Sequence, residues 1–576
     1  MSTNSDSGTP ARIAFALMFG SAVGAVASLA ALLFVELLHL LNDWLLISPR
    51  SRMIAGHGPW LNVATIGVPA IGGLVVGLLV RGIREGRPHG VPDAIRAVQT
   101  FRGYLPGRSG LLTAVASVVG LGCGASVGQY GPLAHMGATI GSFMARLRGH
   151  SQALGTVGIG CGVAAAISTA FNAPIAGIVF AHEVLLRHYS LRAFAPITVA
   201  STMGFVLATI VFQHRPLFRI AEIAPISWPD ILGFALVGIG GALVAIAFMQ
   251  AILYAGRSAH RLPLPGWTKP MLAGALVGLA GVWMPDILGI GRETLRFAII
   301  PGAFTPGELA LTLIAKILTT ALCIGFGFAG GVFSPSLLIG TLFGALAGIG
   351  CAFAGIASTG TLAVYAVCGM VAVTSPVIGA PLTTILIVFE LTRNYELTTA
   401  VMVAVVFSNV VAYRVFGRSL FDVQLARCGF DLSLGRDKVI LADQTIEAYI
   451  SRNYTQIAPG ASLREAREQM RADGTTEAYV TGPAQRYLGT LRLSQMDGRD
   501  QGERASVIAQ REPLVFEATT SIWQAMESMR AFVGESIPVV RAADDPALVG
   551  VVFESAVVSA YMDLIHRIRA EEHGST

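Results

Sequence analysis

Gly128-Gln129-Tyr130-Gly131-Pro132 and Gly330-Gly331-Val332-Phe333-Ser334-Pro335 are the stretches that decide the fold, and His89-Gly90-Val91-Pro92 has the same character. In each stretch glycine permits an irregular backbone, and proline suits the first turn of a helix, where its missing N–H costs nothing. We therefore predict helix starts near residues 90, 131 and 332. A helix N-terminus offers unpartnered N–H donors and about half a positive charge, so it can bind an anion without holding it too tightly for release.

Around these stretches the chain is strongly apolar. Hydrophobic residues make up 53% and charged residues 13%, against about 25% charged in soluble globular proteins, which excludes a conventional cytosolic enzyme. Residues 13–35, 193–212 and 231–256 carry no charge, and each run is long enough to cross a bilayer. The shorter apolar segments 131–145 and 174–180 predict half-helices or re-entrant segments. The alternative is that the glycines and prolines serve only helix packing.

Charge is distributed unevenly along the chain. From Gly429 onward lie 36 of the 75 charged residues, and this tail has a net charge of −6, whereas the preceding body has +11. We attribute the excess in the body to flanks for lipid head groups and to a field that favours anions, and we expect no nucleic-acid partner. Residues 1–12 lack the basic region of a signal peptide and are expected to be retained. The six cysteines have no CxxC spacing, so we expect neither a disulfide framework nor a metal site.

The body contains an internal duplication. Ala173–Glu183 matches Ala380–Glu390 at an offset of 207, and both segments begin with Ala-Pro and end with Glu. Pro132, Gly137 and Gly141 match Pro335, Gly340 and Gly344 at an offset of 203. These matches predict two related halves, about 13–212 and 229–425, and chance similarity is the alternative. Transport proteins with such repeats place their site where broken helices of the two halves meet.

These stretches resemble the anion-site motifs GSGIP, G(K/R)EGP and GxFxP of the CLC family of chloride channels and chloride/proton antiporters. Phe171-Asn172-Ala173-Pro174 and Gly417-Arg418-Ser419-Leu420-Phe421 support the resemblance, which covers about residues 13–560. It implies an all-α polytopic membrane domain with inverted repeats and broken helices, followed by a cytoplasmic α/β pair of CBS modules. It also implies a homodimer with one anion pathway in each subunit. The implied anion-binding residues are His89, Gly90, Val91, Pro92, Gly128, Gln129, Tyr130, Gly131, Pro132, Gly331, Val332, Phe333 and Phe421.

The chain departs from the family at both proton-carrying carboxylates. Gln129-Tyr130 replaces the Arg-Glu pair of the second motif, whose glutamate is the family's outer gate and proton carrier. Tyr130 is a neutral phenol with a donor O–H, so it would gate sterically or not at all. Val184 occupies the place of the inner proton glutamate, while Glu183 matches a neighbouring carboxylate that we expect to bind a helix end.

Two further substitutions fall at the anion site. Phe421 stands where the family usually has a tyrosine hydroxyl that contacts the ion. The Tyr130 O–H could supply a compensating contact, or Tyr130 could simply plug the outer vestibule. His89 replaces the serine of the first motif, a position that in the family is tied to which anion is preferred. The sequence therefore supports selectivity for anions more strongly than selectivity for chloride in particular. We expect His89 to make anion binding or conductance rise as pH falls, and the alternative is a neutral histidine bound within the helix-start turn.

The tail resembles a CBS pair. Residues 461–466 leading to 487–491 parallel residues 519–525 leading to 548–552. Thr/Ser and Asp usually follow the strand glycine by three and six residues. Those places here hold Arg492, Gln495, Phe553 and Ala556. With no carboxylate for ribose hydroxyls, we expect the pair to stabilise a dimer rather than bind adenine nucleotide. The expected divisions are a tail 1–12, a transmembrane domain 13–428, a linker 429–454, the CBS pair 455–565 and a tail 566–576.

The expected function is a passive anion channel in the inner membrane, with both termini cytoplasmic and chloride as the expected ion. Its expected partners are a small anion, membrane lipid and a second copy of the chain, with no cofactor besides bound chloride and no catalysed reaction. One alternative is an anion/proton antiporter that uses His89 and Tyr130 as a relay. Another is a slow transporter whose tail senses nucleotides.

Overall fold

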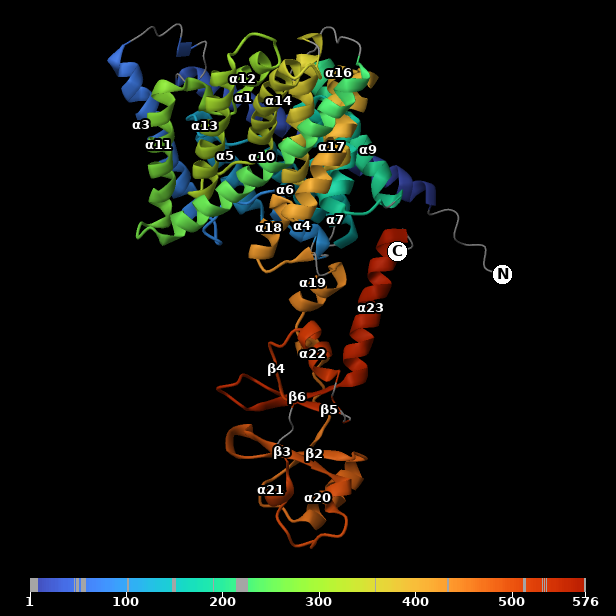
Figure 1. The fold of residues 1–576 in the computed structure, drawn as a ribbon. Helices are drawn as coiled ribbons and strands as arrows, with labels where there is room; N and C mark the ends of the chain where they lie inside the picture. Colours follow the sequence, from blue (N-terminus) through green and yellow to red (C-terminus); the bar gives the residue numbers. More distant parts are fainter. Residues whose placement is uncertain are drawn as a thin grey trace. The chain divides into compact units, whose positions relative to one another are not determined.

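The computed structural model describes residues 9–45, 47, 51–52, 58–100, 103–147, 152–189, 191–213, 226–357, 359–432, 435–510, 514–530, 532, 534 and 536–573. Contacts divide the chain into two units, Met1–Phe430 and Asp431–Thr576. We call them the membrane unit and the tail unit. The described part of the membrane unit is helical, and the described part of the tail unit mixes strands and helices (Figure 1).

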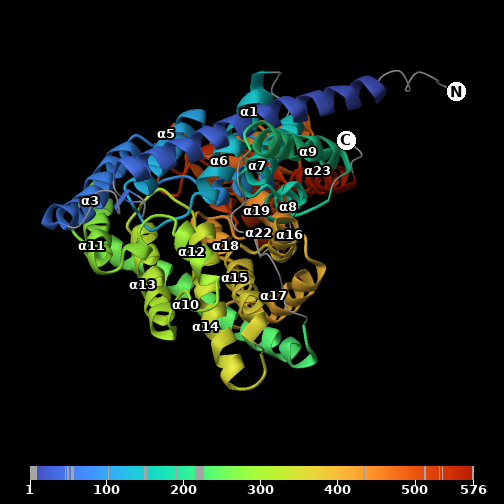
Figure 2. The same cartoon turned by 90° about the horizontal axis from the view of Figure 1, so that it is seen from above.

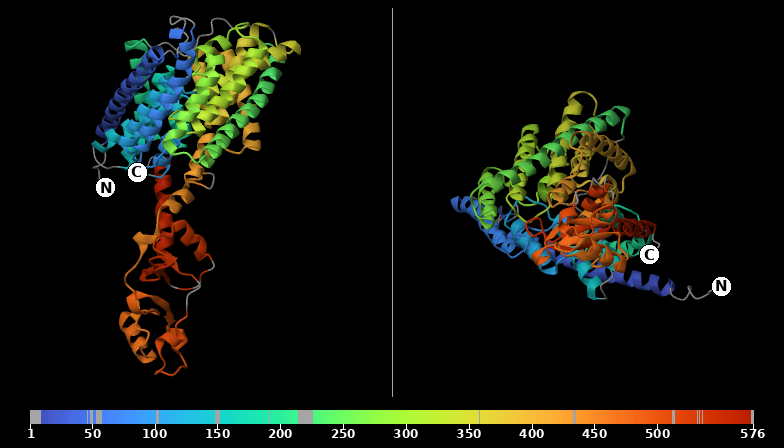
Figure 3. Two further views of the ribbon diagram at one scale, coloured as in Figure 1. Left: turned by 90° about the vertical axis from the view of Figure 1, so that its left-hand side faces the viewer. Right: turned by 90° about the horizontal axis from the view of Figure 1, so that it is seen from below.

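The membrane unit consists of two successive sets of helices. The first set is α1 (Thr9–Trp44), α3 (Pro59–Arg81), α4 (Val91–Gln99), α5 (Gly107–Gly122), α6 (Tyr130–Leu147), α7 (Gln152–Phe171), α8 (Pro174–Phe180) with a π-helical continuation (Ala181–Leu186), and α9 (Leu191–Phe205) with another (Val206–Val211). The second set is α10 (Trp228–Arg261), α11 (Lys269–Trp283), α12 (Arg292–Ala298), α13 (Pro306–Gly325), α14 (Phe333–Phe353), α15 (Leu362–Ile378), α16 (Pro381–Thr392), α17 (Tyr395–Val415) and α18 (Leu420–Arg427). Figures 2 and 3 show the first set, blue to teal, on one side and the second set, mainly green to orange, on the other.

Several helices match the membrane-protein interpretation of the sequence. Among the described residues, eight helices are long and apolar enough to cross a membrane. The three charge-free runs fall largely within α1, α9 with its continuation, and α10. By contrast, α4 has nine residues and α8 has seven, too few to cross a bilayer. The predicted helix starts are confirmed within one residue, at Val91, Tyr130 and Phe333.

Equivalent glycines make equivalent helix pairs in the two halves. In the first half α6 packs on α7, and in the second half α14 packs on α15. A Cβ atom at Gly141 would lie 1.8 Å from the Gly158 carbonyl oxygen, and one at Gly344 would lie 2.3 Å from the Tyr365 carbonyl oxygen. Because both positions need glycine for the same close approach of backbones, the match between the halves reflects structure and not chance composition.

Two glutamates exchange helix caps between the halves. Glu183, after α8, accepts hydrogen bonds from the N–H groups of Leu382 and Thr383 at the start of α16, both at 2.9 Å. Glu390, in α16, accepts from the N–H groups of Ile175 and Ala176 at the start of α8, at 2.9 and 2.7 Å. A helix cap of this kind contributes about 1 kcal/mol. The exchange relates the halves as inverted repeats, and it confirms that Glu183 binds a helix end.

The tail unit contains two similar α/β modules after α19 (Arg436–Asp443). The first module is β1 (Thr455–Ile457), α20 (Leu463–Asp473), β2 (Glu477–Thr481), β3 (Tyr487–Arg492) and α21 (Ala505–Ile508). The second is β4 (Phe516–Glu517), α22 (Ile522–Met529), β5 (Ser536–Val540), β6 (Leu548–Phe553) and α23 (Glu554–His573). In each module the first strand runs parallel to the second and the second antiparallel to the third. Ser462-x-x-Glu465 and Ser521-x-x-Gln524 cap α20 and α22 in the same way, so the predicted pair of CBS-like modules is confirmed.

Candidate anion site

The central feature of the site is a backbone pair between the two halves. The N–H of Gly128 donates to the Gly331 carbonyl and the N–H of Gly331 donates to the Gly128 carbonyl, each at 2.7 Å. A Cβ atom at Gly128 would lie 2.8 Å from the Gly331 carbonyl oxygen, and one at Gly131 would lie 3.0 Å from Gly331 Cα. Only glycine permits this approach, which places the starts of α6 and α14 side by side.

These two helix starts retain unpartnered N–H donors. Among the described residues, no group accepts from the N–H groups of Tyr130 and Gly131 in α6, or from those of Val332 and Phe333 at the start of α14. The neighbouring Gln129 N–H is bound instead by the Ser334 hydroxyl at 3.3 Å. Four backbone donors and two positive helix ends therefore face the junction, which is an arrangement that suits an anion.

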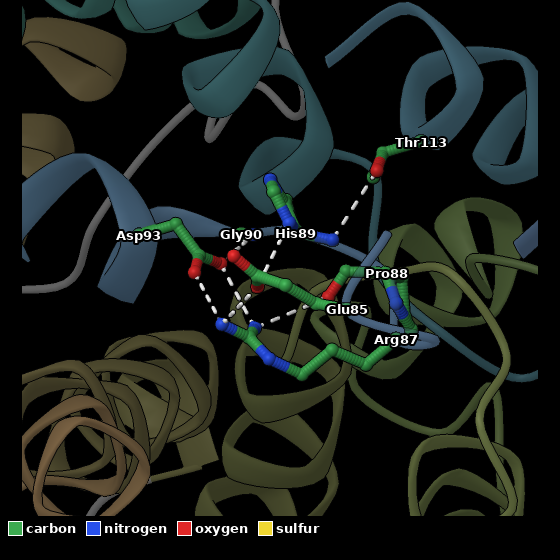
Figure 4. Close-up of polar contacts among 7 residues, drawn as sticks. All are labelled: Glu85, Arg87, Pro88, His89, Gly90, Asp93 and Thr113. Carbon is green, nitrogen blue, oxygen red and sulfur yellow. Dashed lines mark hydrogen bonds and ion pairs between the residues drawn. The ribbon is translucent and has the colours of Figure 1, made fainter. Parts of the chain in front are cut away.

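The start of α4 is different, because the protein satisfies two of its donors itself (Figure 4). The His89 N–H donates to the Thr113 hydroxyl at 3.2 Å, and the Gly90 N–H donates to the Asp93 carboxylate at 2.8 Å. Arg87 in turn holds Asp93 through two hydrogen bonds, of 3.1 and 2.6 Å. Two groups at this helix start remain for an anion, the Val91 N–H and the imidazole of His89.

The His89 imidazole is buried, and one of its nitrogens contacts no polar group of the described residues. Its side chain is 4% exposed, and Nε2 lies 3.1 Å from Glu85 Oε2, in an ion-pair contact without hydrogen-bond alignment. The Nδ1 atom has no hydrogen-bond partner among the described residues. The ring edge meets His135, with centroids 5.7 Å apart. A buried nitrogen without a partner is suited to bind a ligand when it carries a proton.

Glu85, His89 and Asp93 bring their ligand atoms within 4.8 Å of one another, as a metal site would. The Arg87 guanidinium already occupies this space, because it lies 3.0 Å from Glu85 and 2.6 Å from Asp93. A divalent cation would have to displace that charge, so the trio does not fit a metal ion.

Tyr130 lies in a cluster of aromatic rings. Its ring, only 2% exposed as a residue, stacks on Phe171 at 4.0 Å between centroids and meets Phe333 edge-on at 5.5 Å. Phe171 and Phe333 are 5.3 Å apart, and Phe180 lies 6.4 Å from Phe333. We call these four residues the aromatic cluster. It covers the starts of α6 and α14 with apolar surface.

The remaining predicted positions are also buried. Phe421, in the first turn of α18, and Val184, after α8, are 6% and 2% exposed. Ser419 and Asp422 cap α18 reciprocally, which fixes Phe421 between them. Both side chains are apolar, so neither supplies a hydroxyl or a carboxylate to the site.

A cavity of about 290 Å³ lies beside Gln129, lined by residues of α1, α12 and the segment before α12. Arg292, the first residue of α12, lines it, with Nη1 3.4 Å from His39 Nε2. The fully buried Lys316 donates to the carbonyls of Ile287 and Gly289, at 2.9 and 2.8 Å, and so holds the segment that positions Arg292. The sequence analysis missed both residues. Lys316 is the one charged residue of the apolar segment 309–325, and this was the signal that could have identified it. Nothing in the local sequence marks Arg292.

The positions that would hold a nucleotide in the tail unit are engaged otherwise. Arg492 Nε donates to Glu477 at 2.9 Å, and Glu477 accepts from Ser536 of the second module at 3.1 Å. Tyr479 also shares a hydrogen bond with Ser536. The two modules are therefore joined by a polar network between β2 and β5, while Phe553 is exposed and offers no polar group.

A sequence model of the family described as voltage gated chloride channel matches residues 72–413. A putative chloride channel protein ClcB-like from Ralstonia nicotianae is 28% identical over 417 residues, 71% of this chain and 96% of that protein. The H(+)/Cl(-) exchange transporter ClcA of Yersinia pestis is 30% identical over 395 residues, 64% of this chain and 79% of that protein.

Solved structures share the fold. A slow cyanobacterial Cl-/H+ antiporter has a TM-score of 0.65 at 22% identity and covers 72% of this chain and 97% of its own. A eukaryotic CLC transporter has a TM-score of 0.61 at 18% identity and covers 95% and 98%. The second likeness therefore spans both units.

We expect Gly331→Ala to weaken chloride binding about tenfold or more, because its Cβ would lie 2.9 Å from the Gly131 nitrogen and would force the two helix starts apart. Calorimetric titration of the purified chain with chloride measures the effect. Gly67→Ala in α3 is the control, since no atom lies within 4 Å of its Cβ. Unchanged chloride affinity in Gly331→Ala would contradict the central role of the glycine pair.

Proposed function

Since the chain belongs to the voltage-gated chloride channel (CLC) family, we propose that it is a passive anion channel that conducts chloride without moving protons. Members of this family are channels or transporters and not enzymes. The protein is a multi-pass integral membrane protein of the inner membrane, and the topology proposed for it has both termini in the cytoplasm. The similar proteins include both a putative chloride channel and a proton-coupled exchanger, so the distinction has to come from this chain's own residues.

The observation that carries the proposal is that neither of the two positions where the family has a proton-carrying glutamate holds a carboxylate in this chain. Tyr130 and Val184 stand in place of the two proton-carrying glutamates. The carboxylates near the helix starts are engaged, since Glu183 and Glu390 cap helices, and Asp93 and Glu85 both pair with Arg87. A coupled exchanger needs groups that gain and release protons at working pH, and a phenol does so poorly.

The anion would be held mainly by backbone donors. The N–H groups of Tyr130, Gly131, Val332 and Phe333 form the core of the proposed site. The imidazole of His89 would contribute from the α4 side. Arg292 lies in the lining of the cavity beside Gln129, at the motif position where the family has a basic residue, and Asp43, Asp286 and Glu293 line the same cavity.

We further propose that Tyr130 acts as a steric plug. Its stacking on Phe171 and its contact with Phe333 support this proposal, because they hold a buried ring at the start of α6. The competing reading is that the hydroxyl contacts the ion and replaces the hydroxyl absent at Phe421. The two proposals differ in the effect that removing the Tyr130 hydroxyl alone would have on chloride affinity.

The assembly and the tail unit are proposed from the family and from local contacts. We propose a homodimer, for which the large exposed apolar side chains of α16 and α17, among them Leu382, Met402 and Val406, offer a face. The Glu477–Arg492–Ser536 network supports a structural role for the tail unit without bound nucleotide. Calorimetric titration of the full chain with ATP or AMP should then show no binding heat.

A coupled antiporter is the second candidate. The buried His89, in contact with Glu85 and His135, is the observation in its favour, because histidine can carry protons near neutral pH. Tyr130 would have to complete the relay. Simultaneous recording of anion and proton flux separates the two candidates.

In proteoliposomes with an outward chloride gradient, we expect chloride efflux and no proton movement above that of protein-free vesicles. The physical reason is that the pathway lacks a carboxylate that can exchange places with the ion and carry a proton. Tyr130→Glu is the matched variant, and it should lower chloride flux about tenfold because a negative charge would compete for the backbone donors. Proton uptake against a gradient in the unaltered chain would contradict the proposal that the protein is a channel.

Tyr130→Phe tests the plug. A steric plug needs only the ring, so chloride affinity and flux should stay within about twofold of the unaltered chain. Tyr130→Ala, which removes the ring, should raise flux several-fold. If Tyr130→Phe weakens chloride binding about tenfold, as loss of a hydrogen bond to a charged group would, the hydroxyl coordinates the ion.

His89→Gln tests the pH response. We expect chloride flux to rise several-fold as pH falls, because protonated imidazole adds a donor and a positive charge at the site. The groups that face His89 are Glu85, Arg87, Asp93 and His135. Glutamine in place of His89 should flatten the response, whereas His566→Gln in the tail unit should keep it. A full response in His89→Gln would exclude His89 as its source.

A further inference from the structure

A second cavity, of about 500 Å³, lies where the ends of α3, α10 and α13 meet the start of α11, and two of its lining residues, Arg87 and Pro88, directly precede His89. Five of its lining residues are basic or histidine, and no aspartate or glutamate of the described part of the chain lines it. These residues are Arg81, Arg84, Arg87, His260 and Lys269, and Trp267 lies among them. We call this the basic cavity.

Glycine contacts build the walls of the basic cavity. A Cβ atom at Gly77 would lie 1.9 Å from the Trp267 carbonyl oxygen, and one at Gly73 would lie 2.3 Å from the Pro270 carbonyl oxygen. On the other wall, a Cβ atom at Gly325 would lie 2.6 Å from the Ala255 Cβ. The helices therefore meet backbone to backbone, and the cavity between their ends is held by closely packed elements.

The positive charges of the basic cavity are available for a ligand. Arg87 is engaged with Asp93 and Glu85. For Arg81, Arg84 and Lys269, by contrast, no carboxylate of the described residues lies within the 4.0 Å of an ion pair. Three cations without an acidic partner around one concave space repel one another, and a bound anion would relieve that repulsion.

The basic cavity lies at the same end of the membrane unit as α4 and α18. It begins at the end of α3, close in sequence to the start of α4, and α4 contacts α18. Figure 1 shows α4, α18 and the connection from α10 to α11 at the same, lower end of this unit. The chain continues from α18 into the tail unit, and the inference rests on the topology proposed above, in which the tail unit is cytoplasmic and this end faces the leaflet that carries anionic lipid.

The surface next to the basic cavity suits acyl chains. On α3, Ile71, Val75 and Leu78 are exposed and follow one another at helical spacing toward Arg81. On α11, Leu276 and Leu279 are exposed as well. Trp267 is typical of the membrane–water interface, where an aromatic ring lies at the level of the head groups. A cationic cavity thus adjoins an apolar helix surface, which matches the two ends of a phospholipid.

We propose that the basic cavity binds the headgroup phosphate of an anionic phospholipid of the cytoplasmic leaflet. The guanidinium groups of Arg81 and Arg84 are suited to bind phosphate oxygens in pairs, and Lys269 adds a third charge. The acyl chains lie along α3 and α11. The proposal does not depend on whether the protein is a channel or an exchanger.

Native mass spectrometry of the full chain in detergent, titrated with phosphatidylglycerol or with phosphatidylcholine, tests the proposal. We expect preferential retention of phosphatidylglycerol, and at least a tenfold loss of its affinity in Arg84→Gln/Lys269→Gln. The control Arg108→Gln/Arg192→Gln removes two charges from exposed residues outside the cavity and should bind as the unaltered chain does. Arg84→Lys/Lys269→Arg keeps both charges and should retain most of the binding.

Three results would overturn the proposal. One is equal retention of the two lipids. Another is an equal loss in the control variant, which would indicate nonspecific attraction by net charge. The third is inorganic phosphate at millimolar concentration displacing phosphatidylglycerol completely, which would assign the cavity to a free anion. If Arg84→Gln/Lys269→Gln loses its thermal transition, the charge-preserving variant and the lipid preference of the unaltered chain still decide between these outcomes.

Discussion

The two hydrogen bonds between Gly128 and Gly331 are the contact on which the anion site depends. They join one half of the membrane unit to the other at the point where α6 and α14 begin. Two helix N-termini placed side by side repel each other, because each carries about half a positive charge. The backbone pair and the glycine contacts hold them together against that repulsion. A bound anion offsets this repulsion. The close placement of the two N-termini therefore destabilises the empty site and stabilises the anion-bound site.

The broken helices of this protein differ in which residue, if any, supplies the carboxylate that caps their N-terminus. The starts of α8 and α16 receive Glu390 and Glu183 from the opposite half. The start of α4 receives Asp93 from its own first turn. Among the described residues, only the starts of α6 and α14 retain several unpartnered donors at one junction. The protein thus separates structural helix starts, which it neutralises itself, from those left for a ligand.

Sequence reasoning succeeded where the signal is local or repeated. Glycine and proline marked the starts of α4, α6 and α14, and the offset of 207 residues located both Glu183 and Glu390. The capping of Gly90 by Asp93, three residues away, was also readable but was not used. The stacking of Tyr130 on Phe171, and the position of Arg292 beside Gln129, were not readable. They join residues far apart in the chain, and no local preference encodes which side chains meet there.

Replacing a carboxylate by a phenol changes what a gate can respond to. A glutamate in the ion's path carries a full charge, so it competes with the anion, titrates, and responds to membrane potential by about 2.3 kcal/mol per charge per 100 mV. Tyr130 carries no charge and is held by Phe171 and Phe333, each contact of this kind contributing about 0.5–1.5 kcal/mol beyond buried area. Its displacement therefore depends on packing and on the arriving anion, and any voltage dependence must come from the ion itself or from charges outside the aromatic cluster.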